Sequence, residues 1–309
     1  MVAGGKTDID DWSNSTSGNL MLTSTTHQAE TTTGIKGTTA MATKTFDVDG
    51  PAYSVTMSRS GKIAVALTGR QISIYNSEGV YILNFPTVVV TKKERWETTF
   101  ISPHDVSYGS MHNDDISVVG GNNVSHYVVM YDRAGNFKIR FAIPRVSAPR
   151  RIALDRMSDR AFVTETDGHR GQVNVFWMNG MLKRKFGRRQ GLVYPTGITV
   201  DNEDRILVAD SYTAYIYVYR DNGQFLFKFA GKGSNEGQLS LPIDIGTDSS
   251  RNIIVADSGN RRVELLTSRG ELIRHIATDV DPLGIGVGPD GQLVLIEKSK
   301  KKVTILMHY

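Results

Sequence analysis

Short runs of apolar, β-branched and aromatic residues recur along the chain from about residue 45 onward, and polar turn residues separate them. The segment 195–229 shows this pattern most clearly, with runs at Pro195–Asp201, Arg205–Asp210, Tyr215–Tyr219 and Phe225–Phe229. Gly, Asn, Asp or Ser stand in the breaks, as antiparallel hairpins require. No long segment has helical periodicity, so the pattern predicts four short strands joined by three turns.

The same order of runs recurs in six units, and a proline opens each of them. The intervals between these prolines are 40 to 52 residues, a length that suits one four-stranded propeller blade and exceeds that of a helical hairpin repeat. The prolines are Pro51, Pro103, Pro149, Pro195, Pro242 and Pro282. The repeat therefore predicts an all-β propeller of six blades.

The fifth unit contains Pro242-Ile243-Asp244-Ile245, then Val255-Ala256-Asp257-Ser258, then Asn260-Arg261-Arg262-Val263. This order resembles the NHL repeat, whose unit runs Pro-x-Gly-Ile, Val-Ala-Asp-Ser and Asn-x-Arg-apolar before a glycine turn. Units four and five match closely, unit six matches at its start, and units one to three match the skeleton of strands and turns. The resemblance spans about residues 45–309.

The last unit has three strands before the chain ends at Tyr309, whereas the run Lys44–Asp49 precedes the first unit without a partner. A closed ring has no unpaired strand edges, which are sites of aggregation. We therefore expect the N-terminal strand to complete the sixth blade. The predicted domains are a disordered Ser/Thr-rich lead at 1–40 and a six-bladed NHL β-propeller at 41–309.

Composition narrows the classes of function. The chain has 309 residues and no cysteine, so disulfides and zinc–thiolate sites, including those of a RING domain, are excluded from it. No signal-peptide pattern and no apolar run of about 18 residues is found, so neither secretion nor a membrane is expected. We expect a cytoplasmic location.

The net charge is +4, and its distribution predicts one basic face. In a blade with strands A to D, the B-to-C and D-to-A connections emerge on the same face of the ring. The B-to-C connections carry eight Lys or Arg and four Asp or Glu, and the D-to-A connections carry nine basic and six acidic residues. Such a face attracts a polyanion through phosphate contacts and counterion release.

Aromatic and amide side chains accompany these cations, a combination that suits unpaired bases of a single strand. Arginines would hold phosphates in a bidentate manner, and the aromatic, Asn and His residues would sort bases. The candidate RNA-binding residues are Tyr53, Arg70, His104, Asn122, His126, Arg150, Arg151, His169, Arg170, Arg188, Arg189, Tyr194, Tyr212, Arg261, Arg262, Lys298 and Lys300. Trp96, Asn123 and Asn260 are predicted to lie on the same face, where Trp96 would stack a base and the two asparagines would read base edges.

A structural role competes with each of these assignments. A single loop charge is commonly just solvated, and Tyr215, Tyr217 and Tyr219 alternate along one strand, which favours packing between blades. Asp210 and Asp257 recur at the same place in their units, which favours hydrogen bonding within loops over chemistry. His104 and His126 lack carboxylates at a repeated spacing, so no metal and no other cofactor is expected.

The resemblance leaves three classes of function open. Enzymes with similar blades use metals, histidines and disulfides or central carboxylates with calcium, and this chain shows no convincing set. The C-terminal propeller of TRIM-NHL proteins implies instead a non-enzymatic module that binds single-stranded RNA in U-rich untranslated regions of messenger RNA and serves translational repression or decay. The partners would be RNA and protein co-repressors, not DNA or a membrane, and the propeller would be monomeric. The alternative is a protein scaffold that captures a peptide or a partner domain on this face or on the insertion between Pro86 and Ser102.

Overall fold

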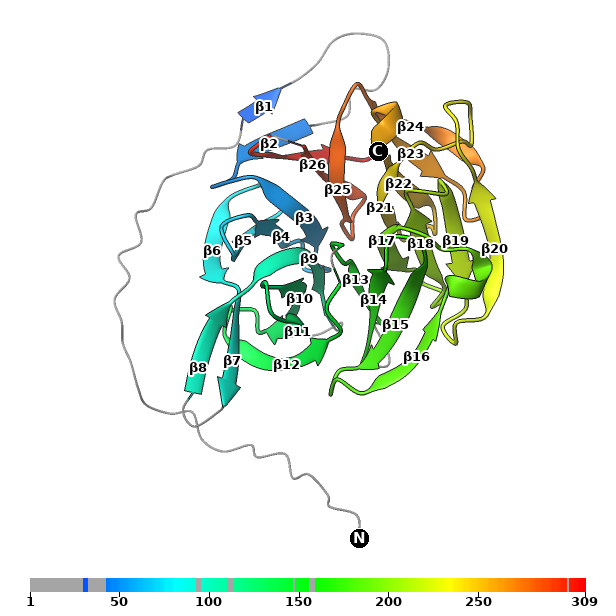
Figure 1. Cartoon of the computed structure of the whole chain (residues 1–309). Coiled ribbons are helices and arrows are strands. Elements are labelled where there is room, and N and C mark those ends of the chain that lie inside the picture. The colour runs from blue at the N-terminus through cyan, green and yellow to red at the C-terminus, as the bar shows by residue number, and fades with distance from the viewer. Residues whose placement is uncertain are drawn as a thin grey trace.

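A computed structural model describes residues 30–32, 43–92, 96–109, 114–146, 148–155, 159–298 and 300–309. Six sheets of four or five antiparallel strands surround a central axis (Figure 1). The all-β fold and the six blades predicted from the proline repeat are confirmed. The expected disorder of residues 1–40 lies outside the described residues, except for 30–32, which form a strand.

The strands of each blade follow one another outward from the axis in chain order. Blade 1 comprises β3 (Ala52–Met57), β4 (Ile63–Leu67), β5 (Gln71–Tyr75) and β6 (Tyr81–Pro86). Blade 2 comprises β9 (Ser102–Tyr108), β10 (Ile116–Gly121), β11 (His126–Tyr131) and β12 (Phe137–Ile143). Blade 3 comprises β13 (Ile152–Leu154), β14 (Arg160–Thr166), β15 (Gly171–Trp177) and β16 (Leu182–Phe186).

The second half of the ring repeats this order. Blade 4 comprises β17 (Pro195–Val200), β18 (Ile206–Asp210), β19 (Tyr215–Tyr219) and β20 (Phe225–Ala230). Blade 5 comprises β21 (Pro242–Thr247), β22 (Ile253–Asp257), β23 (Arg262–Leu266) and β24 (Leu272–Thr278). Short 3-10 turns stand at Arg188–Gln190 and Ser258–Asn260.

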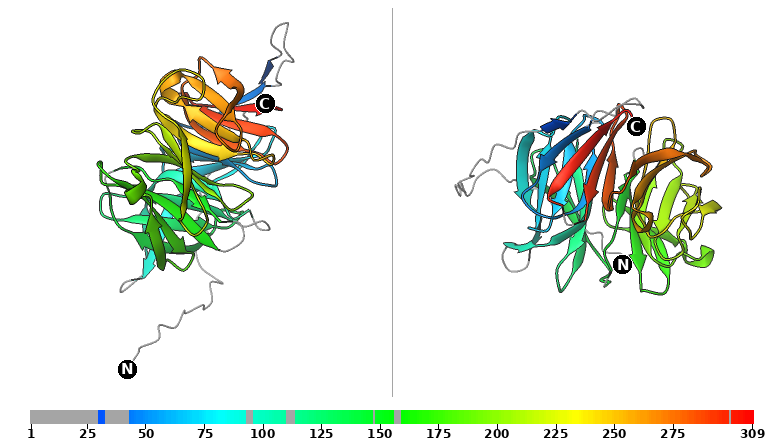
Figure 2. Two further views of the ribbon diagram at one scale, coloured as in Figure 1. Left: turned by 90° about the vertical axis from the view of Figure 1, so that its right-hand side faces the viewer. Right: turned by 90° about the horizontal axis from the view of Figure 1, so that it is seen from above.

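The sixth blade closes the ring with strands from both ends of the chain. It orders β25 (Pro282–Val287), β26 (Gln292–Glu297) and β27 (Lys302–Met307) before β2 (Thr43–Asp47) and β1 (Glu30–Thr32). β2 pairs with β27 from Thr43 opposite Leu306 to Asp47 opposite Lys302. The predicted closure is therefore confirmed, and Figure 2 shows the blue N-terminal strands beside the red C-terminal strand.

The core lies between neighbouring blades, because each sheet buries both faces against its neighbours. Phe46, Val303 and Ile305 of blade 6, for example, pack with Ile63 and Val65 of blade 1. The middle strands β4, β18 and β22 are buried at every position, which explains their nearly continuous apolar sequences.

A glycine–phenylalanine pair recurs at five junctions between blades. The glycine ends the turn between the third and fourth strands with a φ of 80° to 91°, and a Cβ at this position would overlap a phenylalanine from the fourth strand of the preceding blade. The pairs are Gly79 with Phe46, Gly135 with Phe85, Gly180 with Phe141, Gly223 with Phe186 and Gly270 with Phe229.

An additional hairpin, β7 (Val88–Lys92) and β8 (Trp96–Phe100), stands between blades 1 and 2 and projects beyond the ring at the lower left of Figure 1. The hairpin is the structure of the insertion that the sequence indicates between Pro86 and Ser102.

Candidate nucleic-acid interface

Main-chain hydrogen bonds tie the B-to-C connections to the D-to-A connections. Ser211 N donates to Tyr194 O (3.0 Å), Gly171 N to Leu192 O (2.7 Å), and Lys298 N to Asp281 O (2.9 Å). The two sets of loops therefore emerge on one face of the ring, as the strand order predicts. We call this the loop face.

Two repeated aspartates organise these loops. Asp210 Oδ2 accepts hydrogen bonds from Val193 N (2.6 Å) and Tyr194 N (2.9 Å), and its Oδ1 accepts from Tyr212 N (3.1 Å) and Thr213 N (2.9 Å). Asp257 likewise accepts from Ser240 N, Asn260 Nδ2 and Arg262 Nε at 2.7 to 3.0 Å. Their predicted structural role is confirmed.

Four arginines on the loop face make no ion pair or side-chain hydrogen bond with the described part of the chain. Arg70 follows β4, Arg145 follows β12, Arg170 precedes β15, and Arg189 lies between blades 3 and 4; all four are exposed. We call them the cationic arc, because they follow one another over blades 1 to 3. Arg188, beside it, forms an exposed ion pair with Asp167 (2.6 Å), an interaction that contributes little in water.

Four cations on the loop face of blades 5 and 6 are engaged. Arg262 lies 3.0 Å from Asp257 and 2.7 Å from Glu264, and it donates to Gln238 O (2.8 Å) in the loop after β20. Lys300 contacts Glu297 (2.8 Å), Lys298 contacts Asp281 (3.5 Å), and Arg261 donates to Asp279 O (3.3 Å). The arginines that lack an ion pair among the described residues thus lie over blades 1 to 3, whereas exposed Lys232 and Lys301 lack one elsewhere on the loop face.

Two of the arginines that were predicted to bind phosphates form hydrogen bonds within the protein instead. Arg150 is fully buried: its Nη2 donates to Pro144 O, and Glu165 lies 3.7 Å away. Arg151 turns toward the axis, where its Nε donates to Thr196 O (2.7 Å) and its Nη1 to His104 O (3.0 Å). Neither guanidinium is available to a phosphate, which corrects both assignments.

The asparagines that were predicted to read base edges differ in whether their side-chain amides already form hydrogen bonds within the protein. Asn260 Nδ2 is used by Gly233 O (2.9 Å) and Asp257 (2.7 Å), so its predicted contact with a base is corrected too. Asn122 uses only its Oδ1, which accepts from Val124 N and Ser125 N at 2.8 and 2.9 Å. Its amide nitrogen remains without a partner among the described residues.

A hollow of about 580 Å³ opens at the loop face between blades 1 and 2. This volume lies in the range of small-ligand sites. The residues that line it come from four segments of the chain: Arg70, Ser102, His104, Gly121, Asn122, Asn123, Val124, His126, Arg145 and Val146. Five of the residues proposed from the sequence thus meet in one place, and Arg145, Val124 and Val146 join them.

His104 and His126 form an edge-to-face pair in this hollow, with ring centroids 5.4 Å apart. The Nδ1 atoms of both rings have no hydrogen-bond partner in the described structure, and His126 is 7% exposed. Burial, together with His126, Arg150 and Arg151, lowers the pKa of His104 to about 4. Burial, with Arg150 and Arg145, also lowers the pKa of His126. Both rings are therefore neutral at pH 7, each with one donor and one acceptor nitrogen.

The predicted aromatic residues differ in access to solvent. Tyr212 is 73% exposed and Tyr53 is 42% exposed, whereas Tyr194 is half-buried. His169 is exposed beside Arg170. The side chain of Trp96 lies outside the described residues. Leu241, which the sequence did not single out, is 57% exposed and stands directly before the start of β21 at Pro242.

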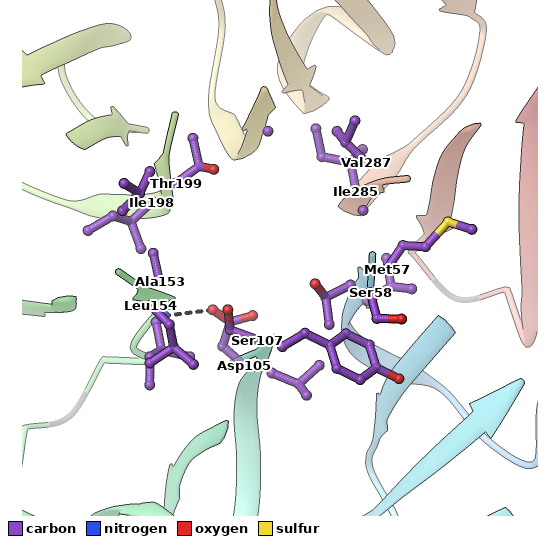
Figure 3. Close-up of a pocket in the computed structure, with 18 of the residues that line it drawn as sticks. Met57, Ser58, Asp105, Ser107, Ala153, Leu154, Ile198, Thr199, Ile285 and Val287 are labelled. Carbon is purple, nitrogen blue, oxygen red and sulfur yellow. Dashed lines mark hydrogen bonds between the residues drawn. The ribbon is translucent and has the colours of Figure 1, made fainter. Parts of the chain in front are cut away.

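The axis holds a second, smaller cavity of about 160 Å³, which the innermost strands of the blades surround (Figure 3). Asp105 Oδ2 accepts from Ile152 N (2.7 Å), and Asp244 accepts from Ile245 N and Ile285 N (both 2.9 Å). Burial raises the pKa of Asp244 to about 7, against the opposing charge of Arg151. Among the described residues, no group of three or more His, Asp or Glu side chains is placed to hold a metal ion.

The chain is similar to two curated proteins over part of its length. It is 32% identical over 138 residues to Protein brain tumor of Drosophila melanogaster, a match that covers 43% of this chain and 13% of that protein. It is 37% identical over 59 residues to human E3 ubiquitin-protein ligase TRIM32, covering 18% of this chain and 9% of that protein. These matches, together with the six-bladed fold, support an NHL-repeat propeller of a TRIM-NHL protein. No family model matches it.

Solved structures with the same fold include enzymes. Virginiamycin B lyase from Staphylococcus aureus superimposes with a TM-score of 0.58 at 15% identity and covers 86% of this chain and 99% of that chain. A streptogramin B lyase structure gives a TM-score of 0.55, also at 15% identity, with 91% and 97% covered. At this identity the likeness shows the fold alone. The NHL propeller spans a small part of its curated relatives, and no helix in its described residues is long and apolar enough to cross a membrane.

Proposed function

We propose that this NHL propeller binds single-stranded RNA along the cationic arc and accepts one unstacked base in the hollow between blades 1 and 2. The observation that carries the proposal is the position of the hollow, with Arg70 and Arg145 in its wall and Arg170 and Arg189 farther along the same face. Phosphates bound by these arginines would direct the intervening base toward the hollow.

The hollow would select a base by hydrogen bonds and not by charge. The neutral rings of His104 and His126 each offer a donor and an acceptor, and Asn122 Nδ2 adds two donor hydrogens. Exposed Tyr53 and Tyr212 provide ring faces on which further bases of the strand can stack. A non-enzymatic role in repression or decay of messenger RNAs with U-rich untranslated regions follows from the family resemblance.

Charge reversal tests the arc. We expect the double substitution Arg170→Glu and Arg189→Glu to weaken binding of a fluorescent U-rich RNA at least roughly tenfold. The dependence of log Kd on log salt should also fall by about 1.4, because two phosphate contacts of a single strand are lost. Fluorescence anisotropy at several salt concentrations measures both quantities.

The matched control is Lys300→Glu with Lys301→Glu on blade 6, which changes the net charge equally. This control should retain most of the affinity, because neither lysine belongs to the cationic arc and Lys300 is already paired with Glu297. Equal losses for the two double variants would show that binding depends on total charge, and they would contradict the arc.

A protein-scaffold role is the second candidate, and the exposed side chains of Tyr212 and Leu241 favour it. An apolar peptide contact would change little with salt, whereas RNA binding should weaken by orders of magnitude between low and moderate salt. The same titration therefore separates the two functions.

A further inference from the structure

The two strands of the β7–β8 hairpin pair in an unbroken register, from Val88 opposite Phe100 to Lys92 opposite Trp96. Just before this ladder, Ile101 N donates to Thr87 O (3.0 Å). Hydrogen-bonded and non-hydrogen-bonded pairs alternate along an antiparallel ladder. The main-chain groups of Val88, Val90, Thr98 and Phe100 therefore point away from the hairpin.

Blade 2 covers the outward groups of β7. Tyr131 Oη lies 2.8 Å from both Val88 N and Val88 O, accepting from the first and donating to the second. Arg140 Nε donates to Val90 O (2.8 Å). These side-chain hydrogen bonds confirm the direction that the ladder assigns to the main chain, and they cap this edge of the hairpin.

The other edge is open. Within the described part of the chain, no hydrogen bond engages the outward N–H and C=O groups of Thr98 and Phe100. β8 contains one charged residue, Glu97, but no proline, no lysine and no bulge, which are devices by which sheet edges commonly avoid further pairing. Figure 1 shows β8 on the outer side of β7, away from the blades.

We propose that β8 accepts an extended peptide segment of a partner protein as a third strand of this sheet. The unpaired amides and carbonyls require an extended main chain, the mode of recognition known as strand addition. The side chains set the chemistry of the partner. Phe100 is 50% exposed beside the half-buried Val88, so an apolar or β-branched residue of the peptide would pack against Phe100.

The size of the edge favours a peptide over a second copy of the chain. β8 is five residues long, whereas stable protein–protein interfaces use about 20 to 30 residues on each side. Main-chain hydrogen bonds along one strand are enough for a short peptide, which does not need a second folded surface.

Substitution at Thr98 tests the open edge without disturbing the hairpin. Thr98 stands opposite Val90 in a non-hydrogen-bonded pair, so Thr98→Pro removes an outward N–H and leaves the β7–β8 ladder intact. The matched control is Thr98→Val, which keeps the N–H. A phage library of random dodecapeptides is selected on the wild-type propeller, and the enriched peptide is labelled for anisotropy measurements on the three proteins.

We expect the selection to enrich peptides with β-branched or aromatic residues at alternate positions. The wild type and Thr98→Val should bind such a peptide with similar affinity, and Thr98→Pro should bind it at least roughly tenfold more weakly. Hydrogen exchange should show new protection at the amides of Thr98 and Phe100.

Equal affinity for Thr98→Pro, or failure to enrich any peptide, would overturn the proposal. Self-association of the wild type that Thr98→Pro abolishes in sedimentation would also overturn it, because the occupant would then be a second copy. The proposal would also be overturned if the Arg170→Glu, Arg189→Glu variant no longer bound the peptide while Thr98→Pro bound it fully. The peptide would then lie on the cationic arc.

Discussion

Side chains with the same sequence context have different roles once they are placed in the ring. Arg150 and Arg189 both belong to arginine pairs in D-to-A connections, yet Arg150 is fully buried and Arg189 is exposed without a partner among the described residues. Burial lowers the pKa of Arg150 to about 10, with Glu165 opposing the shift. Its charge in turn helps to keep the nearby imidazoles of His104 and His126 neutral.

The histidine pair gives a pH dependence with a definite sign. The pKa of His104 is about 4 in the folded chain and about 6.5 when unfolded, so the unfolded chain binds a proton that the native state rejects. The native state therefore loses stability as the pH falls from about 6.5 to 4, by at most about 3 kcal/mol from this residue. Urea unfolding of the wild type and His104→Gln across this range measures the effect.

The difference between the two proteins isolates His104 from groups of opposite sign. Burial raises the pKa of Asp244 and of Glu264 to about 7, so these carboxyls hold protons in the native state and favour folding as the pH falls. His104→Gln should gain stability relative to the wild type on acidification. A constant difference between pH 7 and pH 4 would contradict the assignment.

At the scale of strands and turns, the junction between blades depends on one backbone conformation. Gly223 has a φ of 80°, and a Cβ at this position would lie 2.9 Å from Phe186. The turn therefore needs glycine for two reasons, the left-handed backbone and the close approach of an aromatic ring. The same combination at Gly79, Gly135, Gly180 and Gly270 makes it a property of the repeat.

Alanine substitution separates these two reasons. Gly237 has a φ of 72°, but a methyl group added there would meet nothing within 4 Å, so Gly237→Ala should cost about 1 kcal/mol from backbone strain alone. Gly223→Ala adds overlap with Phe186 and should lower the free energy of unfolding by about 2 to 4 kcal/mol. Chemical denaturation measures both values. Equal costs would show that the aromatic contact does not constrain the turn.

The whole ring depends on a single strand from the N-terminal side. β2 supplies the fourth strand of blade 6, and its Phe46 is buried against Tyr75 of blade 1, with ring centroids 4.6 Å apart. Removing β2 would expose both the edge of β27 and the blade 1 surface that Phe46 covers. Closure thus links the two ends of the chain through hydrogen bonds and through the core.

Deletion of residues 41–49 tests this closure. We expect a fall in melting temperature of more than about 10 °C, since the loss of Phe46 alone removes about 3 to 5 kcal/mol of packing. Differential scanning calorimetry measures the change, and a deletion of residues 1–28 serves as the control for shortening the chain. An unchanged melting temperature after deletion of 41–49 would contradict closure by β2.

Much of the fold could be predicted from the sequence because the information is local. Alternation of apolar residues, turn glycines and the six prolines place the strands and their order, and a ring must close on whichever strand lacks a partner. For the hairpin β7–β8, the sequence indicates an insertion but not its structure. Which of its two edges is capped depends on Tyr131 and Arg140, which are remote in sequence and form hydrogen bonds with β7.

The loop face also followed from strand order, but the state of each charge on it did not. The order of strands in the repeat is enough to place cations and aromatic residues from different blades on one side of the ring. The folded ring was needed to show that Arg262 is held by Asp257 and Glu264, and that Arg151 turns to the axis. It was also needed to show that Arg70 and Arg145 line a hollow beside two neutral histidines. The physical reason is that burial and ion pairing depend on neighbours brought in by other blades, whereas strand order depends on the chain's own repeat.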